Sequence, residues 1–379
     1  MKQITLYLLS LFVSVLLLVG CSNEPPTPEE LYKEEASGVV MVLNKFYYNV
    51  TLPSGDHLYF TSIGEDGTLT GLTDDINEIR KNCGYMTGTA FFINDRGMLL
   101  TNRHVASPII DEAQVKQSLM NIIRYVKALY EARMSNISDQ YNALESQKQE
   151  CVSEDFWGNV EVDQQRLSQI ESEQSELQQQ YNAAMQARDG VGDQLDPSCI
   201  TIHPICELGI AYNDSYVSTE GDFLGKNPCN VVRLSTDEET DLALLQLRSE
   251  KTPDACYVFS VDKRRDQSHW WNIFKKKSEL PSPDSPKIDQ QLYMIGFNAG
   301  IVLANTRKGI KVQMTGGRIT QMPDGSRLLY SIPTMQGSSG SPVVDDRGNL
   351  VGVNFAKLNG TDNFNFGIPL QKVRRFVTE

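Results

Sequence analysis

The stretch Gly337–Ser338–Ser339–Gly340–Ser341–Pro342 has the composition of a nucleophile loop. Glycine adopts backbone angles that are closed to other residues, so the chain can double back around Ser339 and direct its own N–H groups at one point. Upstream, His104 follows an apolar run and Asp241 directly precedes another. Separately, the three residues are also typical of a loop serine, a core histidine and a turn-forming aspartate. Together they predict acyl transfer, with Ser339 as the nucleophile and His104 as the general base.

Short β-strands must position these side chains. Residues 36–42 read ASGVVMV, an apolar and β-branched run. Residues 87–100 read TGTAFFINDRGMLL, in which an Asn-Asp-Arg-Gly turn joins two strands that lead directly to His104. The regular spacing of short apolar runs between Gly, Asn and Asp turns predicts an all-β barrel. Further strands are expected at 199–217, 230–234, 242–247, 292–297, 310–314, 317–322 and 328–332.

A long polar segment interrupts this pattern between residues 108 and 192. It contains few glycines or prolines, and its apolar residues recur in alternating steps of four and three, as in a coiled coil. Because Cys151–Gly158 breaks the pattern, we expect an antiparallel helical hairpin with arms of roughly 40 Å and Cys151 at its tip. Its Leu/Tyr seam is typical of packing. A second interpretation makes the hairpin a binding arm for a protein partner.

The N-terminus has the design of a bacterial lipoprotein leader. A lysine precedes the apolar run Leu6–Val19, which ends in Leu-Val-Gly-Cys. Residues 1–20 are therefore the expected signal peptide, Cys21 the expected lipid-modified first residue, and 21–35 a proline-bearing polar tether. We expect a lipid-anchored protein of the bacterial cell envelope. Because serine rather than aspartate follows Cys21, the sequence favours the outer membrane, facing the periplasm or the cell surface.

Composition narrows the classes of partner and cofactor. The formal net charge of −13 at pH 7 gives no electrostatic basis for binding nucleic acid. The four histidines are scattered and the cysteines lack metal-ligand spacing, so we expect neither a metal nor a cofactor. Beyond Cys21 an even number of cysteines remains in a chain expected to be exported, which permits disulfide bonds. These residues are Cys83, Cys151, Cys199, Cys206, Cys229 and Cys256.

Residues 253–286 form a second insertion that places basic residues beside tryptophan. It contains Lys263–Arg265, His269–Trp271 and Lys275–Lys277, and it ends in a proline-rich run. Such a mixture contacts anionic surfaces or peptides. It is more typical of a solvated loop whose tryptophans pack on the barrel.

The motifs around the three candidate residues resemble trypsin-like peptidases of the HtrA (Deg) type. In chain order they read TGTAFFI, TNRHVA, TDLALLQL, LYMIGFNAG, GGRITQM, SIPTMQGSSGSP, LVGVNFA and FGIPL. The resemblance implies a chymotrypsin-like double six-stranded β-barrel, on which the triad runs in the order His, Asp, Ser. The expected domains are a first barrel at 36–107, the inserted helical hairpin at 108–192, and the rest of the barrels, mainly the second, at 193–379. The hairpin has no counterpart in this resemblance.

Two departures from the family pattern are visible. The chain stops soon after Phe366–Pro369, so the PDZ domains of HtrA proteins are not expected. Ser341 replaces the second glycine of the usual Gly-Ser-Gly-Gly pattern. Because glutamyl-endopeptidase-like relatives tolerate that serine, we do not expect it to inactivate the site.

The resemblance implies a serine endopeptidase acting on protein or peptide substrates. Ser339 attacks the scissile carbonyl, His104 transfers the proton, and Asp241 holds the imidazole in the required tautomer. The N–H groups of Gly337 and Ser339 form the oxyanion hole. The alternative is a catalytically inactive relative that acts as a binding or scaffold module through its hairpin. The expected substrate-pocket walls lack a carboxylate, which favours a small or medium apolar P1 residue; they are Thr334, Met335, Val353, Asn354 and Phe355.

Overall fold

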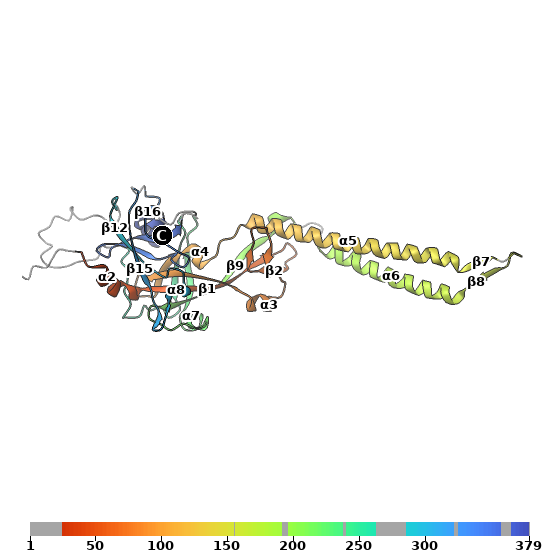
Figure 1. Cartoon of the computed structure of the whole chain (residues 1–379), viewed down its shortest axis with the longest axis horizontal. Helices are drawn as coiled ribbons and strands as arrows, with labels where there is room; N and C mark the ends of the chain where they lie inside the picture. Colours follow the sequence, from red (N-terminus) through yellow and green to blue (C-terminus); the bar gives the residue numbers. More distant parts are fainter. Residues whose placement is uncertain are drawn as a thin grey trace, which may run out of the picture. The chain divides into compact units, whose positions relative to one another are not determined.

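The computed structural model describes residues 25–154, 156–191, 196–237, 240–262, 286–321, 325–357 and 365–378 (Figure 1). The chain divides into two units. The barrel unit consists of Met1–Lys45, Tyr85–Pro108 and Cys206–Glu379, and the arm unit of Phe46–Gly84 and Ile109–Ile205. The expected lipid site at Cys21 and the basic, tryptophan-rich part of the second insertion lie outside the described residues.

Six antiparallel strands close the first barrel. Their order is β1 (Val39–Thr51), β5 (Gly84–Phe92), β6 (Met98–Asn102), β11 (Leu242–Leu247), β10 (Pro228–Leu234) and β9 (Thr201–Tyr212), and β9 pairs again with β1. β2 (His57–Phe60) extends the sheet at the edge of β1. The strand expected to start at residue 36 begins at Val39, after a short 3₁₀ turn over Ala36–Gly38.

Six more strands form the second barrel. Their order is β15 (Gln313–Arg318), β12 (Gln291–Gly296), β17 (Pro342–Asp345), β18 (Leu350–Lys357), β19 (Asn365–Pro369) and β16 (Leu328–Tyr330). A bridge between Ile319 and Tyr330 links the two ends of this sheet. The double barrel confirms the predicted chymotrypsin-like fold. The expected strand at 310–314 is split between β14 (Gly309–Ile310), which pairs with β13 (Asn305–Thr306), and the start of β15.

One apolar cluster joins the two barrels. Met41 and Leu244 of the first barrel pack with Ile295 and Val353 of the second, and all four are buried. Fully burying such a side chain stabilises the fold by about 1.5–3 kcal/mol. The helix α9 (Leu370–Thr378) covers the cluster with Leu370, Val373 and Phe376, which lie on one helix face because they recur every three residues.

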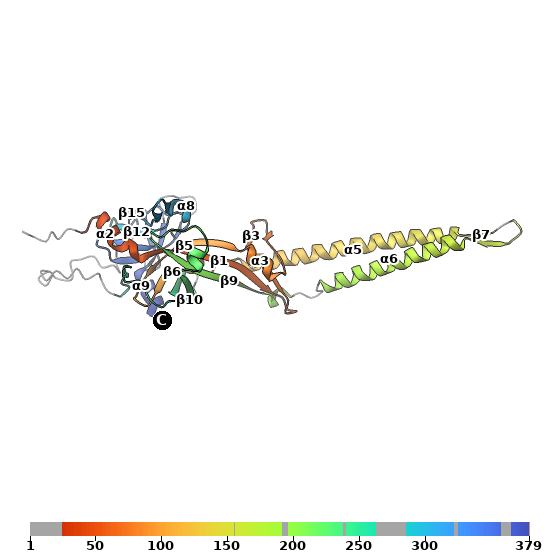
Figure 2. The same cartoon turned by 90° about the horizontal axis from the view of Figure 1, so that it is seen from below.

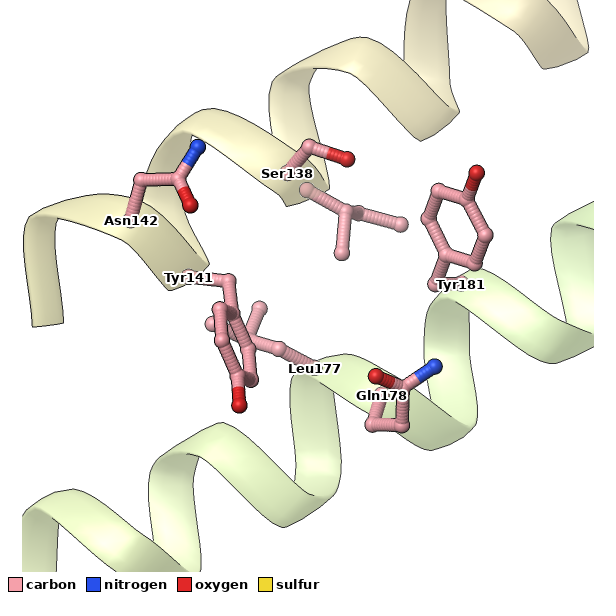
Figure 3. Close-up of a pocket in the computed structure, with 7 residues that line it drawn as sticks. Ser138, Tyr141, Asn142, Leu177, Gln178 and Tyr181 are labelled. Atoms are coloured by element: carbon pink, nitrogen blue, oxygen red, sulfur yellow. The ribbon is translucent and has the colours of Figure 1, made fainter. Parts of the chain in front are cut away.

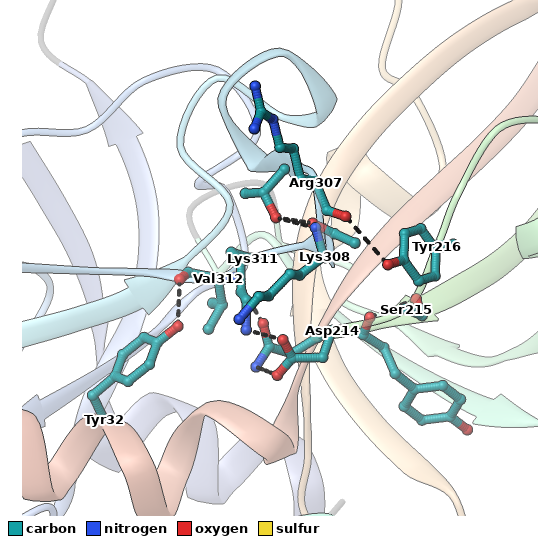
Figure 4. Close-up of polar contacts among 12 residues, drawn as sticks. Tyr32, Asp214, Ser215, Tyr216, Arg307, Lys308, Lys311 and Val312 are labelled. Atoms are coloured by element: carbon teal, nitrogen blue, oxygen red, sulfur yellow. Dashed lines mark hydrogen bonds and ion pairs between the residues drawn. The ribbon is translucent and has the colours of Figure 1, made fainter.

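The tether predicted over residues 21–35 is wrong for its second half, which is the helix α2 (Pro28–Glu35). Thr27 and Glu30 form a capping box and Pro28 occupies the first turn, so the prolines and acids that suggested a tether are a helix-start signal. Leu31 is fully buried. The Tyr32 hydroxyl donates to the carbonyl of Val312 at 3.0 Å (Figure 4). The helix is therefore part of the barrel unit.

Polar contacts fasten the loop after β9 to the β13–β14 hairpin (Figure 4). Lys311 forms an ion pair with Asp214, and the Tyr216 hydroxyl donates to the carbonyl of Arg307 at 3.2 Å. The N–H of Val312 donates to the Asn213 side-chain oxygen at 3.0 Å. These bonds join a segment of the first barrel to a segment of the second.

The arm unit contains the predicted helical hairpin. α5 (Glu112–Glu150) and α6 (Gln164–Gly190) run side by side, with β7 (Val152–Glu154) and β8 (Val160–Val162) at their tip (Figures 1 and 2). At 1.5 Å per residue α6 matches the expected arm of about 40 Å, whereas α5 reaches about 58 Å. None of the described helices combines the length and apolar character that crossing a membrane requires. The unit also contains β3 (Ser62–Ile63), β4 (Leu69–Thr70), α3 (Ile76–Lys81) and a 3₁₀ turn at Pro197–Cys199.

The cysteines expected to permit disulfides are all thiols in the structure: Cys83, Cys151, Cys199, Cys206, Cys229 and Cys256. Burial raises the pKa of Cys229 to about 12. It also raises the pKa values of Cys206 and Cys256. Because the thiolate is the reactive form, these three side chains behave as packing residues near neutral pH.

Candidate functional site

Strand pairing brings the His104 and Asp241 segments together. β6 and β11 are antiparallel, with Leu242 opposite Asn102. β6 ends at Asn102, and the single helical turn α4 (Arg103–Ala106) then carries His104. The carbonyl of Asp241 accepts hydrogen bonds from the Asn102 side-chain amide and from the N–H of Arg103, both at 3.0 Å. Residues far apart in the sequence are thus held at one end of the barrel.

The carboxylate of Asp241 holds His104 at two points. Its Oδ2 lies 2.7 Å from the imidazole Nδ1, and its Oδ1 accepts the backbone N–H of His104 at 3.0 Å. The aspartate is 2 % exposed and has φ of 34°, an uncommon value outside glycine. Because Nδ1 donates to the carboxylate, the proton of a neutral imidazole is on Nδ1 and Nε2 can accept one. This is the arrangement that a general base requires.

The nucleophile loop connects β16 to β17 and is anchored to the first barrel by Thr89 of β5. The N–H of Thr89 donates to the carbonyl of Ser339, and its hydroxyl donates to the carbonyl of Gly337, both at 2.8 Å. Gly337 has φ of 97°, and a Cβ there would lie 2.5 Å from the carbonyl oxygen of Phe297. Both the backbone angle and the lack of space therefore require glycine at this position.

Thr101 places this loop close to the strand that precedes His104. Its hydroxyl donates to the carbonyl of Thr89 at 2.7 Å, and a Cβ on Gly340 would overlap the same hydroxyl. The half-buried Ser339 makes no side-chain hydrogen bond with His104 within the described chain. A catalytic hydrogen bond of this kind often forms only in the substrate complex.

Two backbone N–H groups of the loop have no hydrogen-bond acceptor among the described residues and are available to a ligand. The N–H of Ser338 donates to the carbonyl of Met335 at 3.0 Å, and that of Ser341 to the carbonyl of Ser338 at 3.1 Å. The N–H groups of Gly337 and Ser339 form no hydrogen bond with any described residue. They are the two groups that the sequence assigns to an oxyanion hole, and their availability fits that role.

The expected pocket residues divide by exposure. Thr334, Val353 and Asn354 are buried, Phe355 is half-buried, and Met335 is 54 % exposed. The Thr334 hydroxyl donates to the side-chain oxygen of the buried Asn365 at 2.7 Å. Of the five side chains, Met335 is thus the most open to a bound substrate, whereas Asn354 is used inside the barrel.

Ser341, the residue that departs from the family pattern, is fully buried. Its hydroxyl has no hydrogen-bond partner among the described residues, and it occupies the space that a Cβ on Gly296 would need. The extra side chain is therefore accommodated by a glycine on the neighbouring strand β12.

Several contributing residues were not found by sequence reasoning. Thr89 and Thr101 anchor the loop, although Thr89 lies inside a run that predicts only strands and Thr101 begins the motif TNRHVA, in which His104 is the one candidate. Tyr330, inside the strand expected at 328–332, donates to Asn354. A polar side chain within an apolar run, such as Thr89 in TGTAFF, was the available signal.

Within the described chain, no group of three or more His, Cys, Asp or Glu residues could hold a metal ion.

A cavity of about 150 Å³ lies in the arm unit between α5 and α6 (Figure 3). The cavity belongs to the Leu/Tyr seam predicted from the coiled-coil pattern. It is lined by Ile137, Ser138, Tyr141, Asn142, Leu177, Gln178 and Tyr181.

A known protein family matches part of this chain. Residues 211–353 match the family of trypsin-like peptidase domains, a range that includes Asp241 and Ser339. Among solved structures, the serine endoprotease from Yersinia pestis aligns over 94% of this chain and 67% of its own, at 12% identity and a TM-score of 0.41. No curated protein matches the chain. The family match supports a serine peptidase.

Proposed function

We propose that this protein is a serine endopeptidase that hydrolyses peptide bonds through Ser339, His104 and Asp241. The observation that carries the proposal is the 2.7 Å contact between Asp241 Oδ2 and His104 Nδ1, beside a glycine loop with two unused amides. Here the carboxylate takes both the ring and the backbone N–H, which fixes the direction of Nε2.

The proposed reaction proceeds through an acyl-enzyme. Ser339 Oγ forms a bond to the scissile carbonyl carbon while its proton moves to His104 Nε2. The C–N bond then breaks, and the same proton passes to the leaving amine. Water repeats the cycle on the ester. The amides of Gly337 and Ser339 stabilise the oxyanion, each by about 3 kcal/mol.

A fluorophosphonate probe tests this proposal, because it phosphonylates only a serine that is activated by its surroundings. We expect the wild-type protein to be labelled, with the modified peptide containing Ser339, and the Ser339→Ala and His104→Ala variants to remain unlabelled. Ser249→Ala removes an exposed hydroxyl of the same unit, serves as the control for attachment to the wrong serine, and should be labelled like the wild type. Absence of labelling of a folded wild-type protein at every pH would contradict the enzyme assignment.

A folded wild-type protein that is not labelled would support a second function, that of a scaffold which binds a protein partner through the hairpin. The observation in its favour is the tip of the arm unit, where Phe156 is 94% and Trp157 83% exposed and their rings meet edge to face. Aromatic residues are enriched in protein interfaces. Labelling of Ser339 would leave the hairpin as a recruiting arm for the peptidase.

We further propose that Cys21 is lipid-modified and anchors the protein in the bacterial cell envelope, most simply in the outer membrane. The Leu-Val-Gly-Cys motif after an apolar run supports this. We expect the Cys21→Ala variant to lose palmitate labelling and to move from the membrane pellet to the soluble fraction. Its recovery in the membrane pellet, like that of the wild type, would argue against the anchor.

A further inference from the structure

A buried polar chain connects the second barrel to the nucleophile loop. It consists of Tyr330 on β16, Asn354 on β18 and Ser338, which directly precedes Ser339. Tyr330 is fully buried, and Asn354 and Ser338 are each 2 % exposed. We propose that Asn354, held by Tyr330, is a positioning residue that orients the Ser339 N–H as an oxyanion donor. This inference rests on the proposed function.

Asn354 contacts the loop at two atoms. Its side-chain Nδ2 donates to the carbonyl of Ser338 at 3.0 Å and lies 3.2 Å from the Ser338 hydroxyl. That hydroxyl donates to the carbonyl of Met335 at 2.7 Å. The backbone of Asn354 adds two bonds, accepting the N–H of Gly340 at 3.0 Å and donating to the carbonyl of Ser341 at 2.8 Å. Ser338, Gly340 and Ser341 of the turn are therefore all bonded to one residue of β18.

Tyr330 fixes which way the amide of Asn354 points. Its hydroxyl donates to Asn354 Oδ1 at 2.7 Å, with the carbonyl of Phe366 as a more distant acceptor at 3.0 Å. Burial raises the pKa of Tyr330, which keeps the hydroxyl protonated and able to donate. A carbonyl can only accept, so the amide nitrogen must face Ser338. The hydrogen bonds at Oδ1 and at Nδ2 are therefore both satisfied by the same orientation of the Asn354 side chain.

The bond to Ser338 controls Ser339 because the two atoms share a peptide group. In a planar trans peptide the C=O and the following N–H point in opposite directions. Asn354, together with the N–H of Ser341, holds the carbonyl of Ser338, and the N–H of Ser339 is thereby turned to the opposite side of the peptide. That N–H has no partner in the described chain. Rotation of this one peptide would remove a donor from the oxyanion hole.

Ser338 and Asn354 are each 2 % exposed, so little water reaches the bond between them. Leucine at position 354 would fill a similar volume without offering a donor. We expect the Asn354→Leu variant to lose about 100-fold in kcat, the effect of one oxyanion donor, with KM little changed. Fluorophosphonate labelling should slow by a similar factor. Tyr330→Phe keeps the Asn354 Nδ2 donor and removes only the hydroxyl that orients it. We therefore expect kcat to fall by less than about tenfold.

Controls separate positioning from general destabilisation. Tyr32→Phe removes a comparable hydroxyl bond, to Val312, elsewhere in the barrel unit and should label at the wild-type rate. All rates are compared well below the melting temperature of each variant. A change of melting temperature without a change of kcat would show a merely structural role and overturn the proposal.

Amide hydrogen exchange provides a readout that does not need activity. In Asn354→Leu we expect faster exchange over residues 335–341, where Ser338 and Ser341 donate within the turn, and unchanged exchange in β17. Wild-type exchange at the turn would refute the positioning role. A wild-type protein that is not labelled, combined with faster exchange in the variant, would refute the peptidase and retain Asn354 as the support of the loop.

Discussion

Replacement of Asp241 by asparagine is expected to lower kcat by about 10,000-fold while the protein remains folded. The backbone N–H of His104 donates to Asp241 Oδ1, so an amide at this position keeps its oxygen there. Its nitrogen must then face the imidazole Nδ1, where Oδ2 stands in the wild type. An amide N–H pointing at Nδ1 forces the imidazole proton onto Nε2. The base can then no longer take the proton of Ser339.

Peptide hydrolysis and the melting temperature should be measured together for this variant. Asp254→Asn is the matched control, because that carboxylate is 89% exposed and its ion pair with Lys251 contributes little to stability. It should leave both quantities near the wild-type values. Retention of more than about a tenth of the wild-type kcat in Asp241→Asn would mean that another group orients His104.

Replacement of Gly340 by alanine is expected to lower the free energy of unfolding by about 2–5 kcal/mol and to abolish most activity. Gly340 has φ of 87°, an angle that costs an L-residue about 1–2 kcal/mol. The added Cβ would also overlap the Thr89 carbonyl and the Thr101 hydroxyl, adding about 1–3 kcal/mol of overpacking. Because Thr89 also holds the carbonyl of Ser339, relief of this overlap must move the nucleophile.

Gly325 provides the matched control for the backbone angle. It lies in the same unit with φ of 85°, and a Cβ added there would have no described atom within 4 Å. Gly325→Ala should therefore cost only the angle, about 1–2 kcal/mol, and leave activity intact. Equal denaturant midpoints for the two variants would show that the loop is not packed against β5 and β6 as the structure has it.

The two units differ in how readily the sequence predicts them. The hairpin follows from a repeat that can be read within one segment, because side chains three and four residues apart share a helix face. Its second helix begins at Gln164 after an Asp163 cap, close to the predicted break. α2 was missed since a Thr-Pro-Glu-Glu start resembles a polar tether when the burial of Leu31 is not known.

The residues of the candidate site also differ in how readily the sequence predicts their roles. His104, Asp241 and Ser339 were identified by residue type, order and flanking strands, and the requirement for glycine at 337 follows from the loop composition. Asn354 was assigned to the pocket wall. In the structure its side chain instead joins Tyr330 to Ser338, two partners 24 and 16 residues away.

The sequence by itself determined the chemistry available to this protein, since a strand period, a helix repeat and a reactive side chain are local properties. Only the tertiary structure decided how the reactive side chains are placed and oriented relative to one another. The pairing of β6 with β11 joins His104 to Asp241, and Thr89 and Asn354 hold the loop around Ser339 from two different barrels. These contacts depend on the register between strands distant in the chain, and that register is set by packing of the whole barrel unit rather than by any one segment.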